Sequence, residues 1–129
     1  MKKAGVLNRS LCGAIAELGH GDGVLVCDAG MPIPRGPAVV DLAFTAGIPS
    51  FADVLDGLLG ELVVEAATAA EEVSRVNPET ARLLAARLPA LVFVPHDRLK
   101  SLSAEARLVV RTGEATPFAN VLLRCGVFF

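Results

Sequence analysis

The stretch GHGDGVLVCDAGMPIP, residues 19–34, decides the fold class. Its centre, VLVC over residues 24–27, is a short apolar run bounded by Gly23 and Gly30. Continuous apolar runs of this length are typical of strands that are covered on both faces, as in sheets with parallel strands. Because such a strand needs helices above and below it, the segment predicts an α/β protein.

Helix signals recur on both sides of this strand. Asn8 precedes a helical apolar pattern that ends at Gly19, a residue that suits the left-handed end of a helix. A second helix begins with the capping box Ser50-x-x-Asp53. A third begins at Asn77, and a short one follows over residues 96–102.

Strand patterns fall between these helices, at residues 39–44, 61–66, 90–94, 107–111 and 120–125. The strand over residues 61–66 is expected to run into a helix over residues 68–76. The alternation predicts one domain, residues 1–129, with three α/β/α layers around a mostly parallel, mixed sheet.

Composition limits the classes of partner. The net charge of −2 is scattered without a basic block, which argues against nucleic acid. No window approaches the roughly 18 apolar residues of a membrane helix. The hydrophobic content of 53% is nevertheless high for 129 residues, and the chain closes on Val127-Phe128-Phe129. This apolar surplus predicts a homo-oligomer.

Three cysteines, Cys12, Cys27 and Cys125, follow neither metal-ligand nor disulfide spacing. They are expected to be reduced thiols in the cytoplasm. The sequence also contains no H-E-x-x-H motif and no G-x-S-x-G motif. It therefore predicts no metal, no cofactor and no covalent nucleophile.

His20 lies in the glycine-rich segment Gly19-His20-Gly21-Asp22-Gly23. The dinucleotide fingerprint places its glycines between a strand and a following helix, whereas here they follow a helix and precede a strand. A nucleotide role is therefore disfavoured. Glycine neighbours leave space for a ligand to approach this titratable ring, although a solvated turn histidine is the alternative reading.

Asp28 and His96 each follow a predicted strand almost directly. Ligands of open α/β sheets bind outside the carboxyl ends of strands, so both are candidate binding residues. Turn formation at Gly30 and capping of the helix after residue 95 are the structural alternatives. In the loop over residues 111–120, Phe118 offers an apolar face to a sugar ring, and Asn120 can hydrogen bond to hydroxyls.

Taken together, these segments resemble the D-ribose pyranase family, which is related to the L-fucose mutarotases. The blocks that carry the resemblance are, in order, MKKAGVLN, LGHGD, VCDAGMPIP, DLAFTAGIPSF, VEAATAAEE and VVRTGEATPFANVLLRCGVFF. The resemblance implies a cytoplasmic, cofactor-free isomerase that interconverts the pyranose and furanose rings of β-D-ribose, assembled as a large ring-like homo-oligomer.

The resemblance also implies roles for individual residues. His20 corresponds to the proton donor, and the residues that contact the sugar are Asp28, His96, Phe118, Ala119 and Asn120. Phe118 departs from the family, which usually has tyrosine there. This departure keeps open a mutarotase acting on fucose or another aldose, and a non-catalytic sugar-binding module is the alternative from another class.

The spacing of His20 and Asp28 adds a constraint. At about 3.3 Å per strand residue, Gly23 to Asp28 spans roughly 16 Å, which is longer than a pentose. Unless the glycine loop folds back, the two side chains of one subunit are therefore not expected to hold the same sugar. The hypothesis is a composite pocket, in which the loop of one subunit completes the site of its neighbour.

Overall fold

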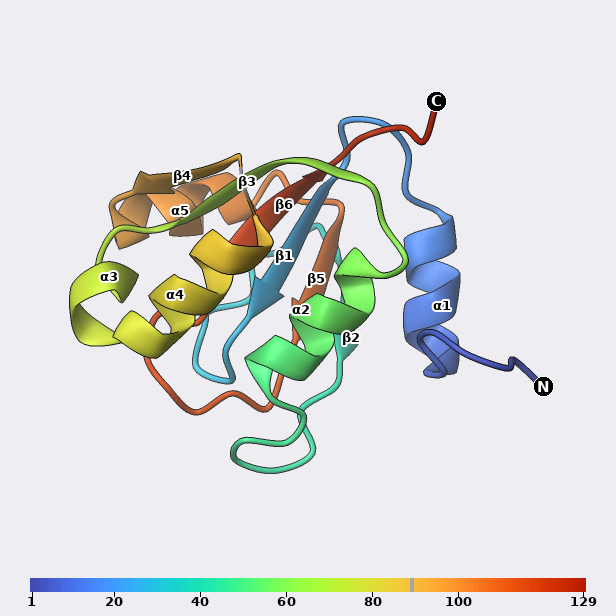
Figure 1. Ribbon diagram of the computed structural model, residues 1–129, viewed down its shortest axis with the longest axis horizontal. Helices are drawn as coiled ribbons and strands as arrows, with labels where there is room; N and C mark the ends of the chain where they lie inside the picture. Colours follow the sequence, from blue (N-terminus) through green and yellow to red (C-terminus); the bar gives the residue numbers. More distant parts are fainter. Residues whose placement is uncertain (89) are drawn as a thin grey trace.

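Residues 1–88 and 90–129 are described by a computed structural model in which strands and helices alternate (Figure 1). The elements are, in order, α1 (Arg9–Ala16), β1 (Gly23–Cys27), β2 (Ala38–Asp41), α2 (Phe51–Leu59), β3 (Val64–Ala70), α3 (Val73–Val76), α4 (Pro78–Arg87), β4 (Leu91–Val94), α5 (His96–Ser103), β5 (Leu108–Arg111) and β6 (Val121–Cys125).

Within these residues, six strands form one sheet in the order β2-β5-β1-β6-β3-β4. β6 runs antiparallel to both of its neighbours, β1 and β3. The other pairs, β2 with β5, β5 with β1 and β3 with β4, are parallel. The predicted mostly parallel, mixed sheet is confirmed.

Helices cover the two faces of the sheet unequally. In Figure 1, α2 and α4 lie in front of the sheet, and α5 lies behind it near β3 and β4. Val24 and Val26 of β1 belong to the core cluster that includes Phe51 of α2. Leu25 and Cys27 belong to a smaller cluster on the other face. β1 is thus buried on both faces, as its apolar run predicts.

The predicted helix starts are confirmed by their capping bonds. The side chain of Asn8 accepts a hydrogen bond from the Leu11 N–H (2.9 Å). Ser50 accepts one from the Asp53 N–H (3.1 Å). The side chain of Asn77 likewise caps α4.

The helix expected over residues 68–76 is wrong in its first part. β3 continues to Ala70, and α3 begins only at Val73. The alanine-rich segment has good helix propensity, but it lies between β6 and β4, where Ala67, Ala69 and Ala70 are buried. Pairing on both edges therefore overrides the local preference. β2 also ends at Asp41 instead of Phe44.

None of the helices in the described ranges is long and apolar enough to cross a membrane.

Candidate functional site

Asp28 and Asn120 are brought together by the strand register. Asp28 follows β1, and Asn120 precedes β6, which pairs antiparallel with β1 through Val26 and Val121. The Asn120 amide donates to Asp28 Oδ2 (2.8 Å), and Asn120 Oδ1 accepts from the Asp28 N–H (2.9 Å). Both residues are buried, Asn120 with 1% of its surface exposed. This reciprocal pair fixes the two side chains at the carboxyl end of β1.

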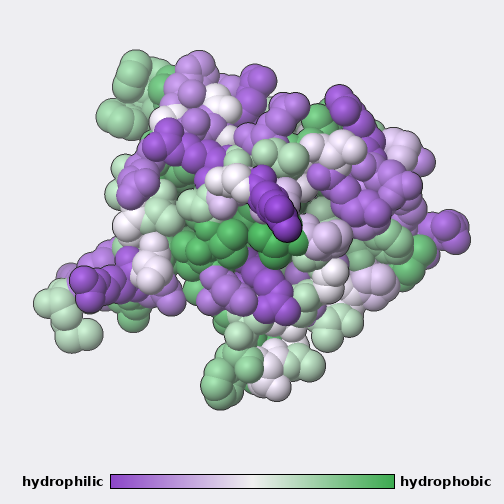
Figure 2. All heavy atoms as spheres, turned by 180° about the vertical axis from the view of Figure 1, so that it is seen from behind, coloured by the Kyte–Doolittle hydropathy of each residue, from purple (hydrophilic) through white to green (hydrophobic). Residues whose placement is uncertain are grey.

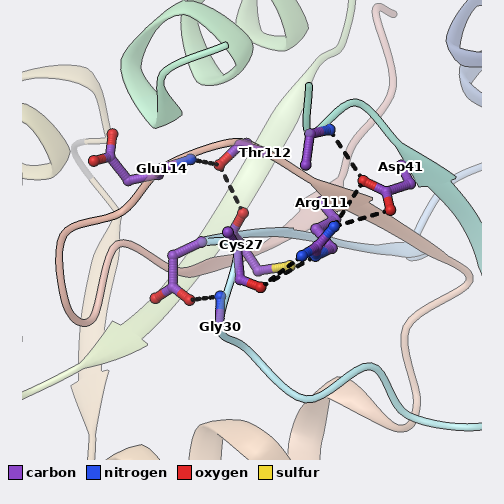
Figure 3. A network of polar contacts seen from close by, with 9 residues as sticks. Cys27, Gly30, Asp41, Arg111, Thr112 and Glu114 are labelled. Carbon is purple, nitrogen blue, oxygen red and sulfur yellow. Dashed lines mark hydrogen bonds and ion pairs between the residues drawn. The ribbon is translucent and has the colours of Figure 1, made fainter. Parts of the chain in front are cut away.

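Arg111 holds the loop that follows Asp28. As the last residue of β5, it lies in register with Cys27 of β1 and Asp41 of β2. Its guanidinium donates two hydrogen bonds to the carbonyl of Ala29 (2.9 and 3.2 Å) and pairs with the Asp41 carboxylate (3.0 Å). Figure 3 shows Arg111 beside Asp41 in this network. Arg111 therefore ties the loop after β1 to the end of β2.

Thr112 and Glu114 extend the network to α2. Thr112 donates to the carbonyl of Cys27 (2.9 Å) and accepts from the Glu114 N–H (3.1 Å) (Figure 3). The Glu114 carboxylate accepts hydrogen bonds from the N–H of Phe51, at the start of α2, and from Thr116. Burial opposes ionisation of Glu114, but these hydrogen bonds lower its pKa overall. The loop after β5 is thereby anchored to the first turn of α2.

His96 begins α5 directly after β4 and Pro95. Its backbone N–H donates to both oxygens of Glu72 (3.0 and 3.1 Å). Hydrogen bonds from the backbone N–H groups of Glu72 itself and of His96 lower the pKa of the Glu72 carboxyl. Nδ1 of His96 is buried without a hydrogen-bond partner among the residues that the structure describes. A buried ring nitrogen of this kind is suited to accept a hydrogen bond from a ligand or to donate one to it.

Phe118 meets the His96 ring edge-on, with 5.0 Å between ring centroids and 86° between planes. It has a φ of +58°, which is unusual for an aromatic residue. The turn is held by Asn77, whose amide donates to Thr116 and to the carbonyl of Pro117 (2.9 Å each). Strained backbone that its surroundings hold in place is concentrated at functional sites, so Phe118 is a candidate ligand contact on its own geometry.

His20 lies at the opposite end of β1, in the loop between α1 and β1. Its side chain is 61% exposed, and its Nε2 is 3.1 Å from Oε2 of Glu65. A cavity of about 270 Å³ adjoins it, lined in part by Val127, Phe128 and Phe129. Within one chain, the structure therefore separates His20 from the other predicted site residues, as the strand length indicates.

Cys27 and Cys125 show no sign of catalytic activation. Cys27 is fully buried next to Asp28, and burial together with the Asp28 charge raises the pKa of its thiol to about 12. Burial also raises the pKa of Cys125. All three cysteines are free. In the described parts of the chain, His, Cys, Asp and Glu side chains form no group of three that could hold a metal ion.

With this geometry established, comparison with known proteins assigns the family. Residues 1–128 match the RbsD / FucU transport protein family. The chain belongs to this family. Among its relatives, the D-ribose pyranase of Streptomyces avermitilis is 76% identical over the whole of both chains. The D-ribose pyranase 1 of Rubrobacter xylanophilus is 63% identical, also over both full lengths.

Solved structures agree with the RbsD / FucU assignment. The structure of Bacillus subtilis RbsD complexed with D-ribose superposes with a TM-score of 0.95, at 40% identity and full coverage of both chains. The fucose mutarotase of Streptococcus pneumoniae, complexed with L-fucose, gives a TM-score of 0.81 over the full length of both chains. At 18% identity, this second likeness concerns the fold alone.

Three residues that contact the candidate site residues or their loops were not predicted as site residues, although they lie in segments that carry the resemblance. Glu65, Glu72 and Arg111 all contact candidate site residues or their loops. The position of Arg111 at the end of a predicted strand was a usable signal, since charges at carboxyl ends of neighbouring strands converge. Glu65 and Glu72 gave no comparable signal, because their partners are remote in sequence.

Proposed function

We propose that this chain is a D-ribose pyranase, an isomerase that interconverts the pyranose and furanose forms of β-D-ribose without a cofactor. The observation that carries this proposal is the 76% full-length identity to a protein of that name. The polar cluster of Asp28 and Asn120, beside the paired rings of His96 and Phe118, supports a small polyhydroxylated ligand. The proposed setting is the cytoplasm, where free thiols persist.

The reaction breaks and re-forms the bond between C1 and a ring oxygen, and the only groups transferred to or from the protein are protons. A proton reaches the ring oxygen as the bond from C1 to that oxygen breaks, and its electron pair stays on the oxygen. The anomeric hydroxyl gives up its proton as the C1 carbonyl forms. Closure reverses these transfers with a different hydroxyl attacking C1. Positioned acid–base groups typically accelerate such steps by about 10²–10⁴-fold.

Each predicted site residue has a role in this scheme. His20 is the proposed proton donor, because its imidazole is exposed to an approaching ligand and histidine is the side chain used most often for general acid–base catalysis. Asp28 and Asn120 are proposed to bind sugar hydroxyls. His96 and Phe118 are proposed to bound the ring, with Ala119 supplying backbone between them and Asn120.

The proposed pocket is composite, because His20 and Asp28 lie at opposite ends of β1 in one chain. Completion of the site then requires His20 from a neighbouring copy in a homo-oligomer. The apolar residues beside His20 support such a contact, since Phe128 and Phe129 are 88% and 90% exposed. In Figure 2, hydrophobic side chains project at the corner where Figure 1 places the C-terminus.

Subunit mixing tests the composite pocket. Co-expression of chains carrying His20→Ala with chains carrying Asn120→Ala is expected to give activity above both parents, since some pockets combine two intact halves. The matched control combines Asp28→Asn with Asn120→Ala, which damage the same half and are expected to give no recovery. A His20/Asn120 mixture that never exceeds its parents contradicts the composite pocket.

Exchange NMR on a panel of sugars tests the substrate. The proposal predicts that the protein accelerates pyranose–furanose exchange of D-ribose well above the rate for L-fucose. Faster turnover of L-fucose would instead favour a mutarotase that acts on fucose or another aldose. That alternative is kept open by Phe118, which lacks the hydroxyl of a tyrosine. Ribose binding with no acceleration of exchange would favour the non-catalytic module.

A further inference from the structure

His20 is carried on a loop that is anchored on both sides. The N–H of Gly21 donates to the carbonyl of Cys125 (2.8 Å), and the Cys125 N–H donates to the carbonyl of Asp22 (2.9 Å). The Asp22 carboxylate accepts from the Gly19 N–H (2.8 Å) and pairs with Arg107. The backbone on either side of His20 is therefore fixed, and the remaining freedom lies in its side chain.

The side chain of His20 is held by Glu65 on β3. His20 Nε2 lies 3.1 Å from Oε2 of Glu65, and the other carboxylate oxygen accepts from Arg124 of β6 (2.7 Å). The hydrogen bond with His20, together with the Arg124 charge, lowers the pKa of the Glu65 carboxyl. Glu65 is thus a carboxylate at neutral pH, engaged by an imidazole on one oxygen and a guanidinium on the other.

Glu65 also lies at an irregularity in the sheet. Val64 pairs with Cys125 and Ala66 pairs with Arg124, so Glu65 is an additional residue between two adjacent positions of β6. A bulge of this kind re-aims a side chain at the expense of regular pairing, and bulges are over-represented next to active sites. Gly126 leaves room for it, since a Cβ there would lie 3.2 Å from the Cβ of Glu65.

We propose that Glu65 is the positioning residue of the proton donor, orienting His20 by accepting a hydrogen bond from its Nε2. This inference rests on the proposed function. With the proton on Nε2 held by the carboxylate, Nδ1 is the nitrogen that exchanges protons with the sugar. The carboxylate also fixes the orientation of the imidazole ring, as carboxylates do for other catalytic histidines.

Ring opening then proceeds by proton transfer from His20. Protonated His20 gives its Nδ1 proton to the ring oxygen as the bond between C1 and that oxygen breaks, and the electron pair of the bond stays on the oxygen. The anomeric hydroxyl releases its proton to water or a carboxylate as the carbonyl forms. On closure, the attacking hydroxyl returns a proton to Nδ1, and the carbonyl oxygen regains one. Glu65 keeps its negative charge throughout.

The first test compares Glu65→Gln with Asp56→Asn by exchange NMR on D-ribose. Asp56 is the matched control, since it is another exposed carboxylate paired with arginine (Arg87, 2.7 Å), and its side chain makes no hydrogen bond to His20. Glu65→Gln is expected to lower kcat by about 10-fold or more, with little change in KM, since replacing carboxylates that orient metal-bound histidines costs about 10- to 100-fold and the carboxylate of a catalytic triad about 10⁴-fold. Asp56→Asn is expected to change kcat by less than about 3-fold.

The double variant separates positioning from general damage. If Glu65 acts through His20, Glu65→Gln in a His20→Ala background is expected to cause no further loss of kcat. Two outcomes overturn the proposal: an unchanged kcat in Glu65→Gln, or the same fold loss from Glu65→Gln whether or not His20 is present.

A second readout does not depend on turnover. Nitrogen NMR of the imidazoles, with the His20 signals identified by their loss in His20→Ala, reports which ring nitrogen carries the proton. Glu65→Gln is expected to shift His20 from the Nε2-protonated tautomer toward a mixture, and Asp56→Asn is not. An unchanged His20 spectrum overturns the positioning role. If the parent protein fails to accelerate ribose exchange but the tautomer shifts, the proposed function fails while the Glu65–His20 contact stands.

Discussion

At the scale of single residues, Phe118 is the position at which the sequence resemblance implies a departure from the D-ribose pyranase family. The ring packs edge-on against His96, and the backbone is held at a positive φ by its surroundings. Tyrosine, the residue that the resemblance implies at this position, would keep this packing and add one hydroxyl. The substitution Phe118→Tyr therefore isolates the contribution of a single hydrogen bond to sugar binding.

Phe118→Tyr is expected to lower the KM for D-ribose by roughly 3- to 10-fold, the equivalent of one net hydrogen bond of about 1 kcal/mol. The control is Phe44→Tyr, which adds a hydroxyl to a ring that is 85% exposed. Saturation kinetics by exchange NMR measures both variants. Equal KM values for the parent and Phe118→Tyr would mean that this position does not contact the sugar through a hydroxyl.

At the scale of elements, the ends of three neighbouring strands converge on the loop that carries Asp28. Arg111 at the end of β5 binds the carbonyl of Ala29 and the carboxylate of Asp41. Arg111→Met is expected to raise the KM for ribose and to lower kcat/KM by about 10-fold, because the loop loses two charge-assisted hydrogen bonds.

Arg87→Met is the control for Arg111→Met. It removes an exposed arginine from a single surface pair with Asp56, a kind of pair that contributes about 0–1 kcal/mol. It is expected to leave ribose kinetics unchanged. If Arg111→Met had the same KM and kcat/KM for ribose as the parent protein, Arg111 would not position Asp28.

Glu114 gives a pH-dependent prediction at the same scale. The pKa of its carboxyl is lowered by hydrogen bonds from Phe51 and Thr116, against the opposing effect of burial. Because the pKa of Glu114 is lower in the folded state than in the unfolded state, its ionised carboxylate stabilises the protein at pH values above the ordinary glutamate pKa of about 4.3. This stabilisation is lost as the pH falls through the folded-state pKa. Glu114→Gln is therefore expected to cost about 1 kcal/mol at neutral pH and progressively less below pH 4.

Urea unfolding at neutral and acidic pH measures this difference. Glu79→Gln, an exposed position in the first turn of α4, is the control and is expected to change the free energy of unfolding by less than about 0.5 kcal/mol at either pH. A cost for Glu114→Gln that is the same at both pH values would contradict the role of the Glu114 charge.

The elements also show how far the sequence alone could lead. The apolar run of β1 and the caps Asn8, Ser50 and Asn77 are local signals, so the strand and helix starts that they indicate could be predicted. Asp28 and His96 could be placed at strand ends for the same reason. The length of β3 and the bulge at Glu65 could not, because both are set by pairing with β6, more than fifty residues later in the chain.

At the scale of the whole molecule, part of the apolar surplus is exposed at the two chain ends, and other exposed apolar side chains lie on β2, on β4 and in the loop between β2 and α2. The C-terminal residues Phe128 and Phe129 pack edge-on against each other and remain almost fully exposed. They adjoin His20 through a shared cavity. In the proposed assembly, a neighbouring copy covers this surface and brings its own Asp28 cluster to His20.

The double substitution Phe128→Ser with Phe129→Ser is expected to reduce the size of the assembly, measured by light scattering, and to lower activity in parallel. Val76→Ser is the control, since it lies on α3, on the side of the molecule away from the C-terminus (Figure 1). An assembly of unchanged size and activity would show that this corner is not a contact between copies.

In the proposed reaction, the imidazole of His20 transfers protons during ring exchange of ribose. Saturation-transfer NMR on equilibrated D-ribose, with the parent protein and with His20→Ala at equal concentration, measures that step directly. The parent is expected to accelerate exchange clearly, and the variant is expected to lose about 10²-fold or more of that acceleration. Equal exchange rates for the two proteins would contradict it.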